Sequence, residues 1–268
     1  MNDDVSDIAA MYNNDPEKEN SRLERHQLEF DLTWRYLERY LPPQGAILEI
    51  GAATGRYTLG LARRGYRVTA VDLSAGLLEV CKQGLQEAGL AQQVQFVEAD
   101  ARDLSAVTEG AFDAVLLMGP LYHLVIEADR KLAVKATADR LRAGGVLVAA
   151  FISRLGIMGD LMKNTPDWIE HTAEVRSVME RGRDPDDFPR GGFRGYFVRV
   201  EEIAPLFEGA GFKTQVVAGV EPAVSAEDEI YNVLEGKQRE LWLDLLFEIS
   251  AEPSLLAASR HLLYIGQK

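Results

Sequence analysis

The stretch from Ala46 to Gly55, which reads AILEIGAATG, decides the fold of this chain. Its first half is an apolar run of strand length, and its second half is rich in glycine and alanine. A helical pattern then continues to about Arg64. In parallel α/β sheets a strand, a tight glycine turn and a helix form a ligand-binding unit, because glycine lets bare backbone approach the ligand. We therefore expect a ligand at this turn.

Beyond this turn, short β-rich runs alternate with longer helical patterns. Such alternation is typical of a doubly wound α/β sheet with helices on both faces, as in Rossmann-like folds. Ser74 is a typical helix N-cap, and Gly144-Gly145 is expected to end a helix. The expected strands are residues 46–50, 67–71, 94–97, 112–118, 146–152, 212–220 and 260–265, and the expected helices are residues 54–64, 75–88, 127–141 and 200–207.

Three segments fall outside this alternation. The pattern of residues 1–41 predicts a helical N-terminal extension, which is followed by Pro42-Pro43. Residues 221–258 are acidic and also have a helical pattern. Residues 153–199 are about twice as long as an ordinary strand–helix connection. Segments added to a regular core often shape the substrate pocket, because the core itself is committed to packing. We expect residues 1–41 and 153–199 to be lids on a core that spans residues 42–268.

Asp72, at the end of the second expected strand, indicates a nucleoside ligand. A carboxylate there can accept hydrogen bonds from ribose hydroxyls. The alternative is a tight turn without a ligand, in which Asp72 only caps a helix. The dinucleotide pattern G-x-G-x-x-G is absent, because Ala53 and Arg56 stand where it needs glycine. The phosphate-loop pattern G-x-x-x-x-G-K-[ST] is absent as well.

Four segments in order over residues 46–152 carry recognisable motifs. They are Glu49-x-Gly51-x-Ala53-x-Gly55, Glu98-Ala99-Asp100-Ala101, Phe112-Asp113-Ala114-Val115 through Gly119-Pro120-Leu121-Tyr122-His123-Leu124, and Leu141-Arg142-Ala143-Gly144-Gly145-Val146-Leu147. These motifs resemble those of class I S-adenosylmethionine-dependent methyltransferases. The form of the fourth motif, Gly-Pro-Leu-Tyr-His-Leu, is similar to that of the small-molecule branch, akin to quinone-biosynthesis methyltransferases. One departure is alanine at position 53, where the first motif has its middle glycine.

The resemblance implies a seven-stranded sheet whose last strand is antiparallel, with S-adenosylmethionine as the cofactor. It also implies which residues of this chain contact that cofactor. They are Glu49, Gly51, Ala52, Gly55, Asp72, Leu73, Asp100, Ala101 and Met118.

Methyl transfer needs an aligned acceptor and the exclusion of water, and it needs a base only if the acceptor arrives protonated. The fourth motif places Tyr122 and His123 next to the methyl group. His123 is either that base or a residue that orients Tyr122 or the loop after the fourth expected strand. The sequence leaves both roles open. Tyr196 is a third candidate catalytic residue. Substrate contacts are expected from Arg194 in the long insertion, unless that part is an ordinary surface turn, and from Tyr12 and Arg22 in the N-terminal segment.

Composition and motifs narrow the class of molecule that could accept the methyl group. The net charge is −13, and a surface so acidic disfavours nucleic acid, as does the absence of the base-gripping Asn/Asp-Pro-Pro-aromatic pattern at Met118. The chain has one cysteine, Cys81, which we interpret as part of the core. Its four histidines are scattered along the sequence, so we expect no metal site. We therefore predict methylation of O, N or C of a small metabolite. The alternatives are a tRNA or protein methyltransferase, or a catalytically silent cofactor-binding subunit.

The acidic N-terminus lacks the pattern of a signal peptide. Apolar runs stay far below the ~18 residues of a membrane helix. A cytoplasmic protein without a membrane partner is the expectation.

Overall fold

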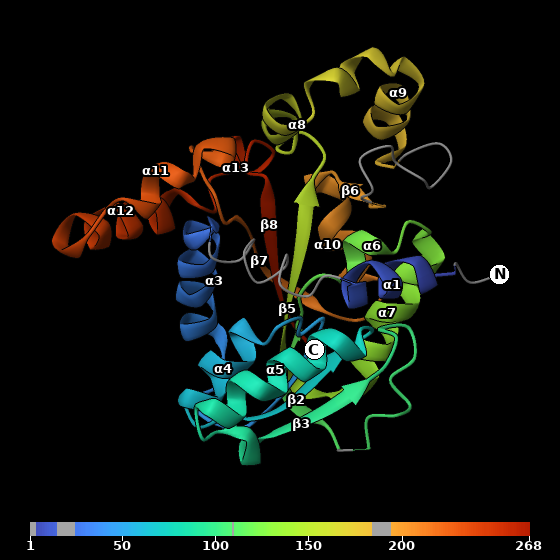
Figure 1. The fold of residues 1–268 in the computed structure, drawn as a ribbon, viewed down its shortest axis with the longest axis vertical. Helices are drawn as coiled ribbons and strands as arrows, with labels where there is room; N and C mark the ends of the chain where they lie inside the picture. The colour runs from blue at the N-terminus through green and yellow to red at the C-terminus, as the bar shows by residue number, and fades with distance from the viewer. Residues whose placement is uncertain (1–3, 15–24, 109, 184–193) are drawn as a thin grey trace.

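A computed structural model describes residues 4–14, 25–108, 110–183 and 194–268 (Figure 1). Its sheet is formed by β1 (Ala46–Ile50), β2 (Arg67–Asp72), β3 (Val94–Glu98), β4 (Phe112–Leu117), β5 (Leu141–Ser153), β6 (Phe197–Val198), β7 (Lys213–Gly219) and β8 (His261–Gln267). The sheet order is β3-β2-β1-β4-β5-β8-β7, and β6 pairs with the end of β5.

The sheet has the expected parallel core and antiparallel last strand. Neighbours among β1 to β5 run parallel, whereas β8 is antiparallel to both β5 and β7. The chain therefore has the predicted Rossmann-like fold. Because β8 runs backwards, its first residue lies at the same edge of the sheet as the carboxyl ends of the parallel strands.

Helices cover both faces of the sheet, because successive strand residues point to opposite faces and both sets are apolar. The helices are α1 (Ser6–Asn14), α3 (Gln27–Tyr40), α4 (Arg56–Arg63), α5 (Ala75–Glu87), α6 (Pro120–His123), α7 (Glu127–Arg140), α8 (Met158–Asn164), α9 (Thr172–Arg181), α10 (Val200–Glu208), α11 (Glu229–Asn232), α12 (Gly236–Ile249) and α13 (Pro253–Leu256), with short 3-10 turns η1 (Ala91–Gln93), η2 (Pro166–Glu170) and η3 (Ser225–Glu227). Ile47 faces one buried cluster with α3, α4, α5 and α12, and Leu48 faces the other with α7 and α10.

Local sequence signals predicted the ends of most of these strands and helices to within a few residues. Ser74 caps α5 as predicted, because its side chain accepts a hydrogen bond from the Leu77 amide at 3.1 Å. The prediction for Gly144-Gly145 was wrong. Helix α7 already ends at Arg140, and the two glycines lie in an irregularity of β5, between the pairs Phe112–Leu141 and Ala114–Val146. The sequence also missed β6, which is only two residues long.

The segments outside the alternation take different places. Helix α3 packs in the core, with Leu28, Leu32 and Leu37 fully buried, so this half of the N-terminal segment is more than a lid. Helices α8 and α9 lie beyond the end of β5, and α11 and α12 lie beside α3 (Figure 1). Among the residues described, no helix has the length and apolar character needed to cross a bilayer.

Candidate active site

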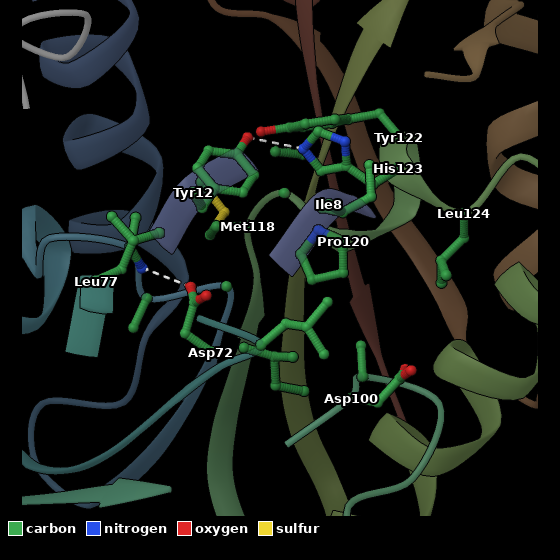
Figure 2. Close-up of a pocket in the computed structure, with 18 of the residues that line it drawn as sticks. Ile8, Tyr12, Asp72, Leu77, Asp100, Met118, Pro120, Tyr122, His123 and Leu124 are labelled. Atoms are coloured by element: carbon green, nitrogen blue, oxygen red, sulfur yellow. Dashed lines mark hydrogen bonds between the residues drawn. The ribbon is translucent and has the colours of Figure 1, made fainter. Parts of the chain in front are cut away.

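A pocket runs along the edge of the sheet where the parallel strands end. It extends from β3 through β2, β1, β4 and β5 to the start of β8, and α1 covers part of it (Figure 2). It is lined by Val5, Ile8, Tyr12, Glu29, Ile50, Gly51, Ala52, Ala53, Arg56, Tyr57, Asp72, Leu73, Leu77, Ala99, Asp100, Ala101, Met118, Gly119, Pro120, Tyr122, His123, Leu124, Ala150 and His261.

The glycine turn after β1 brings bare backbone to this pocket. Gly51 has φ +81°, and a Cβ there would collide with the carbonyl of Met118 and the ring of Pro120. Ala53, at the position of the missing motif glycine, also has a positive φ of 49°. Asp72 holds the turn, because its Oδ2 accepts a hydrogen bond from the Ala53 amide at 2.8 Å. Turn and carboxylate thus lie side by side, as the sequence predicted.

Two residues predicted to contact the cofactor do not line the pocket. Glu49 is buried behind the turn, where its carboxylate accepts a hydrogen bond from the Thr58 hydroxyl at 2.6 Å. Burial, with a smaller effect from the charge of Asp72, raises the pKa of Glu49 to about 8. Gly55 starts α4 in a left-handed conformation and packs against Cys81. Both residues shape the turn from behind.

The other predicted cofactor residues, Ala52, Leu73, Asp100, Ala101 and Met118, line the pocket. Asp100 is held by its neighbour Arg102, whose Nε donates to both carboxylate oxygens at 3.0 Å. Arg102 also donates to Asp129 at 2.6 Å, and Asp129 is buried. This ion pair fixes the carboxylate of Asp100 at the β3 end of the pocket.

Helix α1 is anchored over the pocket at both of its ends. Near its start, Arg194 donates to the Asp4 carbonyl at 2.9 Å and forms an ion pair with Asp7 at 3.6 Å. Near its end, the side-chain oxygen of Asn13 accepts hydrogen bonds from the Ser74 hydroxyl at 2.7 Å and the Gly76 amide at 2.9 Å. The helix thereby places Ile8 and Tyr12 on the pocket (Figure 2).

His123 links α1 to the fourth motif. Its Nε2 lies 2.9 Å from the Tyr12 hydroxyl (Figure 2). Its Nδ1 lies 3.3 Å from the Arg194 carbonyl. The ring of Tyr122 packs against it, with 4.8 Å between ring centroids. Both nitrogens of His123 therefore have partners, which suits a residue that holds the loop and α1 together.

Neither Tyr196 nor Arg194, which the sequence predicts to reach the acceptor, lines the pocket. The Tyr196 hydroxyl donates to Glu202 at 2.6 Å, and the Arg130 guanidinium lies 3.5 Å from its ring centroid. Burial and this hydrogen bond raise the pKa of Tyr196 to about 12. Arg194 is used to anchor α1. The predicted contact Arg22 lies outside the described residues, and no described residue of the 153–199 insertion lines the pocket.

Sequence reasoning missed a polar cluster at the other end of the pocket. His261, the first residue of β8, and Glu29 of α3 both line the pocket. Behind them Glu221 is fully buried, and its Oε2 accepts hydrogen bonds from the His261 amide at 2.9 Å and from His261 Nδ1 at 3.0 Å. Its Oε1 accepts a hydrogen bond from Arg260. These residues are far apart in the sequence, so no motif spacing could reveal them.

The expectation of no metal site rested on the spacing of histidines along the chain, yet the fold gathers two of them with carboxylates. Arg260 lies among His26, Glu221 and Asp228, with Nη2 at 2.8 Å from His26 Nδ1 and 3.4 Å from Asp228. Beside it, His261 Nδ1 also lies 3.5 Å from Glu29. A guanidinium and an imidazole thus already sit among the carboxylates, and within the described chain we interpret the cluster as a salt-bridge network.

Comparison with known proteins identifies the fold unit that carries this pocket. Residues 47–145 match a family model described as a methyltransferase domain. Residues 47–145 therefore form a methyltransferase domain. Strands β2 to β4, all of β1 except Ala46, and the glycine turn belong to the matched stretch, so the carboxyl-edge pocket is built largely on this domain.

Relatives of the methyltransferase domain differ in their acceptors. The tRNA 5-carboxymethoxyuridine methyltransferase of Escherichia coli is 29% identical over 171 residues, which cover 61% of this chain and 62% of that protein. The ubiquinone biosynthesis O-methyltransferase of Xanthomonas axonopodis is 34% identical over 120 residues, covering 44% and 48%. The chain therefore matches less than two thirds of the length of these relatives.

A solved structure supports the fold over the whole chain. The 1,6-didemethyltoxoflavin-N1-methyltransferase of Burkholderia thailandensis, with bound S-adenosylhomocysteine, aligns with a TM-score of 0.59 at 15% identity, covering 98% of this chain and 88% of that one. The pocket fits such a nucleoside cofactor, because bare backbone at Gly51, a carboxylate at Asp72 and apolar walls at Leu73 and Met118 meet in one cavity.

Proposed function

We propose that this protein transfers the methyl group of S-adenosylmethionine to a small metabolite held in the carboxyl-edge pocket. The observation that carries the proposal is the continuity of the pocket from Asp100 and Asp72 to Tyr122 and His261. One cavity therefore offers room for a nucleoside at β2 and β3 and for an acceptor at β4, β5 and β8. In open α/β sheets this edge is where ligands bind.

The cofactor half has a role for each lining residue. Gly51, Ala52 and Ala53 present backbone to the cofactor, and Asp72 accepts hydrogen bonds from its ribose hydroxyls. Asp100, held by Arg102, lies where the adenine amino group would donate, with Leu73, Ala101 and Met118 as apolar walls. When bound, the cofactor supplies a methyl group on a sulfonium, whose leaving group is a neutral thioether.

The acceptor half is formed by elements that close over the sheet edge. Ile8 and Tyr12 come from α1, Tyr122 and His123 from α6, and His261 from β8. These side chains align the acceptor and exclude water, which are the main tasks of the protein in a methyl displacement. We assign His123 the role of holding α1 closed through Tyr12.

A small acceptor is favoured over tRNA by charge and by enclosure. The chain carries a net charge of −13, and three of its acidic residues, Glu29, Asp72 and Asp100, line the pocket itself. An RNA backbone is bound by neutralising phosphates with basic side chains, so this surface opposes it. Helix α1 also covers a pocket that a flipped base would have to enter.

The test is to incubate the protein with methyl-labelled S-adenosylmethionine, a metabolite extract, and bulk tRNA and protein in one reaction. We expect label in one small-molecule fraction and no gain in macromolecules. Label confined to tRNA would support the activity named for the E. coli relative instead. Tight cofactor binding without any labelled product would favour a silent cofactor-binding subunit.

A further inference from the structure

We propose that His261, oriented by Glu221, is the general base that takes a proton from the acceptor, and that the acceptor therefore carries a hydroxyl or an amine group. The inference rests on the proposed methyl transfer and names the acceptor class of that same site. It departs from the sequence-based candidate, His123.

The geometry fixes the His261 ring. Glu221 Oε2 accepts hydrogen bonds from both the main-chain amide and Nδ1 of His261, at 2.9 and 3.0 Å. Glu221 is itself fully buried, and Arg260 binds its other oxygen. A buried carboxylate on Nδ1 keeps the proton on that nitrogen and leaves Nε2 as the acceptor of a proton. Among the described residues, no hydrogen bond to Nε2 is recorded, and His261 lines the pocket.

The surrounding charges favour proton uptake by this ring. Glu29 of α3 lies 3.5 Å from Nδ1, Arg260 is the preceding residue, and the His26 ring lies 6.5 Å away. Burial lowers the pKa of His261, but the carboxylates of Glu29 and Glu221 outweigh burial and the opposing charge of Arg260, so the pKa lies above its usual 6.5. A base with a pKa near the working pH is effective in proton transfer.

His123 is less suited to this role. Its Nε2 already lies at hydrogen-bond distance from the Tyr12 hydroxyl, and its Nδ1 faces a carbonyl. The two pocket histidines thus have different roles. His123 holds helix α1 in place through Tyr12, and His261 takes the proton.

The step balances without a further reagent. The acceptor's O–H or N–H bond breaks, and its proton moves to Nε2 of His261. The acceptor's lone pair forms the new bond to the methyl carbon, and the carbon–sulfur bond breaks with its electrons staying on sulfur. The products are the methylated acceptor, S-adenosylhomocysteine and protonated His261, which then releases its proton to solvent.

The first experiment compares His261→Asn with His171→Asn, which changes a histidine outside the pocket. With the metabolite fraction that the wild type methylates, His261→Asn should lower kcat by about 10²–10⁴-fold. Its affinity for S-adenosylhomocysteine by calorimetry and its melting temperature should stay close to those of the wild type. A kcat within about threefold of the wild type would overturn the proposal. The proposal would also be overturned if a chelator abolished wild-type activity and a divalent metal restored it.

The second experiment follows the protonation of His261 directly, and its NMR part needs no acceptor. The imidazole signal that disappears in His261→Asn is followed by NMR against pH. In the wild type we expect its midpoint above 6.5, and in Glu221→Gln we expect a lower midpoint, because the carboxylate that favours the proton is gone. The acid limb of the wild-type kcat/KM profile should match the first midpoint. An unshifted midpoint in Glu221→Gln would contradict the dyad. A wild type that binds cofactor but methylates nothing would overturn the proposed function, and the proposal with it.

Discussion

Ala53 holds a backbone conformation that suits glycine. Its φ of +49° lies in the left-handed region, where a Cβ is unfavourable by about 1 kcal/mol. Ala53→Gly should therefore raise the free energy of unfolding by up to about 1 kcal/mol, less the entropy that glycine adds to the unfolded chain. Urea denaturation measures this. Ala52→Gly is the control, since it removes a buried methyl at an ordinary φ and should destabilise. Equal losses in both variants would show that position 53 is not strained.

Glu49 makes stability depend on pH. Burial raises its pKa from 4.5 to about 8, so the folded state holds a proton that the unfolded state releases above about pH 4.5. The unfolding free energy of the wild type should thus fall relative to Glu49→Gln as pH rises from about 4.5 to about 8, and the difference should stay constant above that. Glutamine can still accept the Thr58 hydrogen bond.

The change should reach a few kcal/mol, since each unit of pKa shift corresponds to about 1.4 kcal/mol. Urea midpoints at pH 5, 6, 7 and 8 for both proteins provide the measurement. Parallel pH profiles would mean that Glu49 is ionised in the folded state.

Helix α1 works as a cover because three separate contacts hold it. Tyr12→Phe removes the hydroxyl that bonds to His123, a contribution of about 0.5–1.5 kcal/mol, and leaves the Asn13 and Arg194 anchors. S-adenosylhomocysteine should then dissociate roughly 2- to 10-fold faster in stopped-flow experiments. Tyr40→Phe, on α3 and outside the pocket, should leave the rate unchanged. Equal dissociation rates in Tyr12→Phe and the wild type would show that the hydrogen bond plays no part in retention.

The α/β core was predictable because its signals are local. The strand at residues 46–50 and the cap at Ser74 depend on neighbouring residues, and motif order then locates Asp72 and Met118 at one edge. Side-chain direction is not a local property. Tyr196 lies near the expected edge, but its ring turns into the core beneath Arg130.

The His261 cluster shows the same limit at larger sequence separation. Glu29, Glu221 and His261 come from three distant segments, and only the antiparallel return of β8 brings them to the pocket. No pattern in a single sequence encodes that meeting. Four scattered histidines therefore gave no hint of a cluster, although two of them lie in it.

Across the whole molecule, the two edges of the sheet provide a matched comparison for the cofactor site. Asp72 holds the turn at the carboxyl edge, where its Oδ2 accepts a hydrogen bond from the Ala53 amide at 2.8 Å. Asp113 makes a similar contact at the amino edge of the sheet, where its carboxylate accepts a hydrogen bond from the Ala46 amide at 2.6 Å. Only Asp72 lines the pocket. Replacing either residue by alanine removes a structural hydrogen bond, but only Asp72→Ala also removes a proposed cofactor contact.

Calorimetric titration of S-adenosylhomocysteine into the wild type, Asp72→Ala and Asp113→Ala tests the proposed site most directly. Loss of a hydrogen bond to a charged group amounts to about 1–3 kcal/mol, so affinity in Asp72→Ala should fall by roughly 5- to 150-fold. Asp113→Ala should bind like the wild type even if its melting temperature falls. Equal affinity in Asp72→Ala and the wild type, or tight binding of a nicotinamide dinucleotide in place of S-adenosylhomocysteine, would contradict the assignment of the pocket.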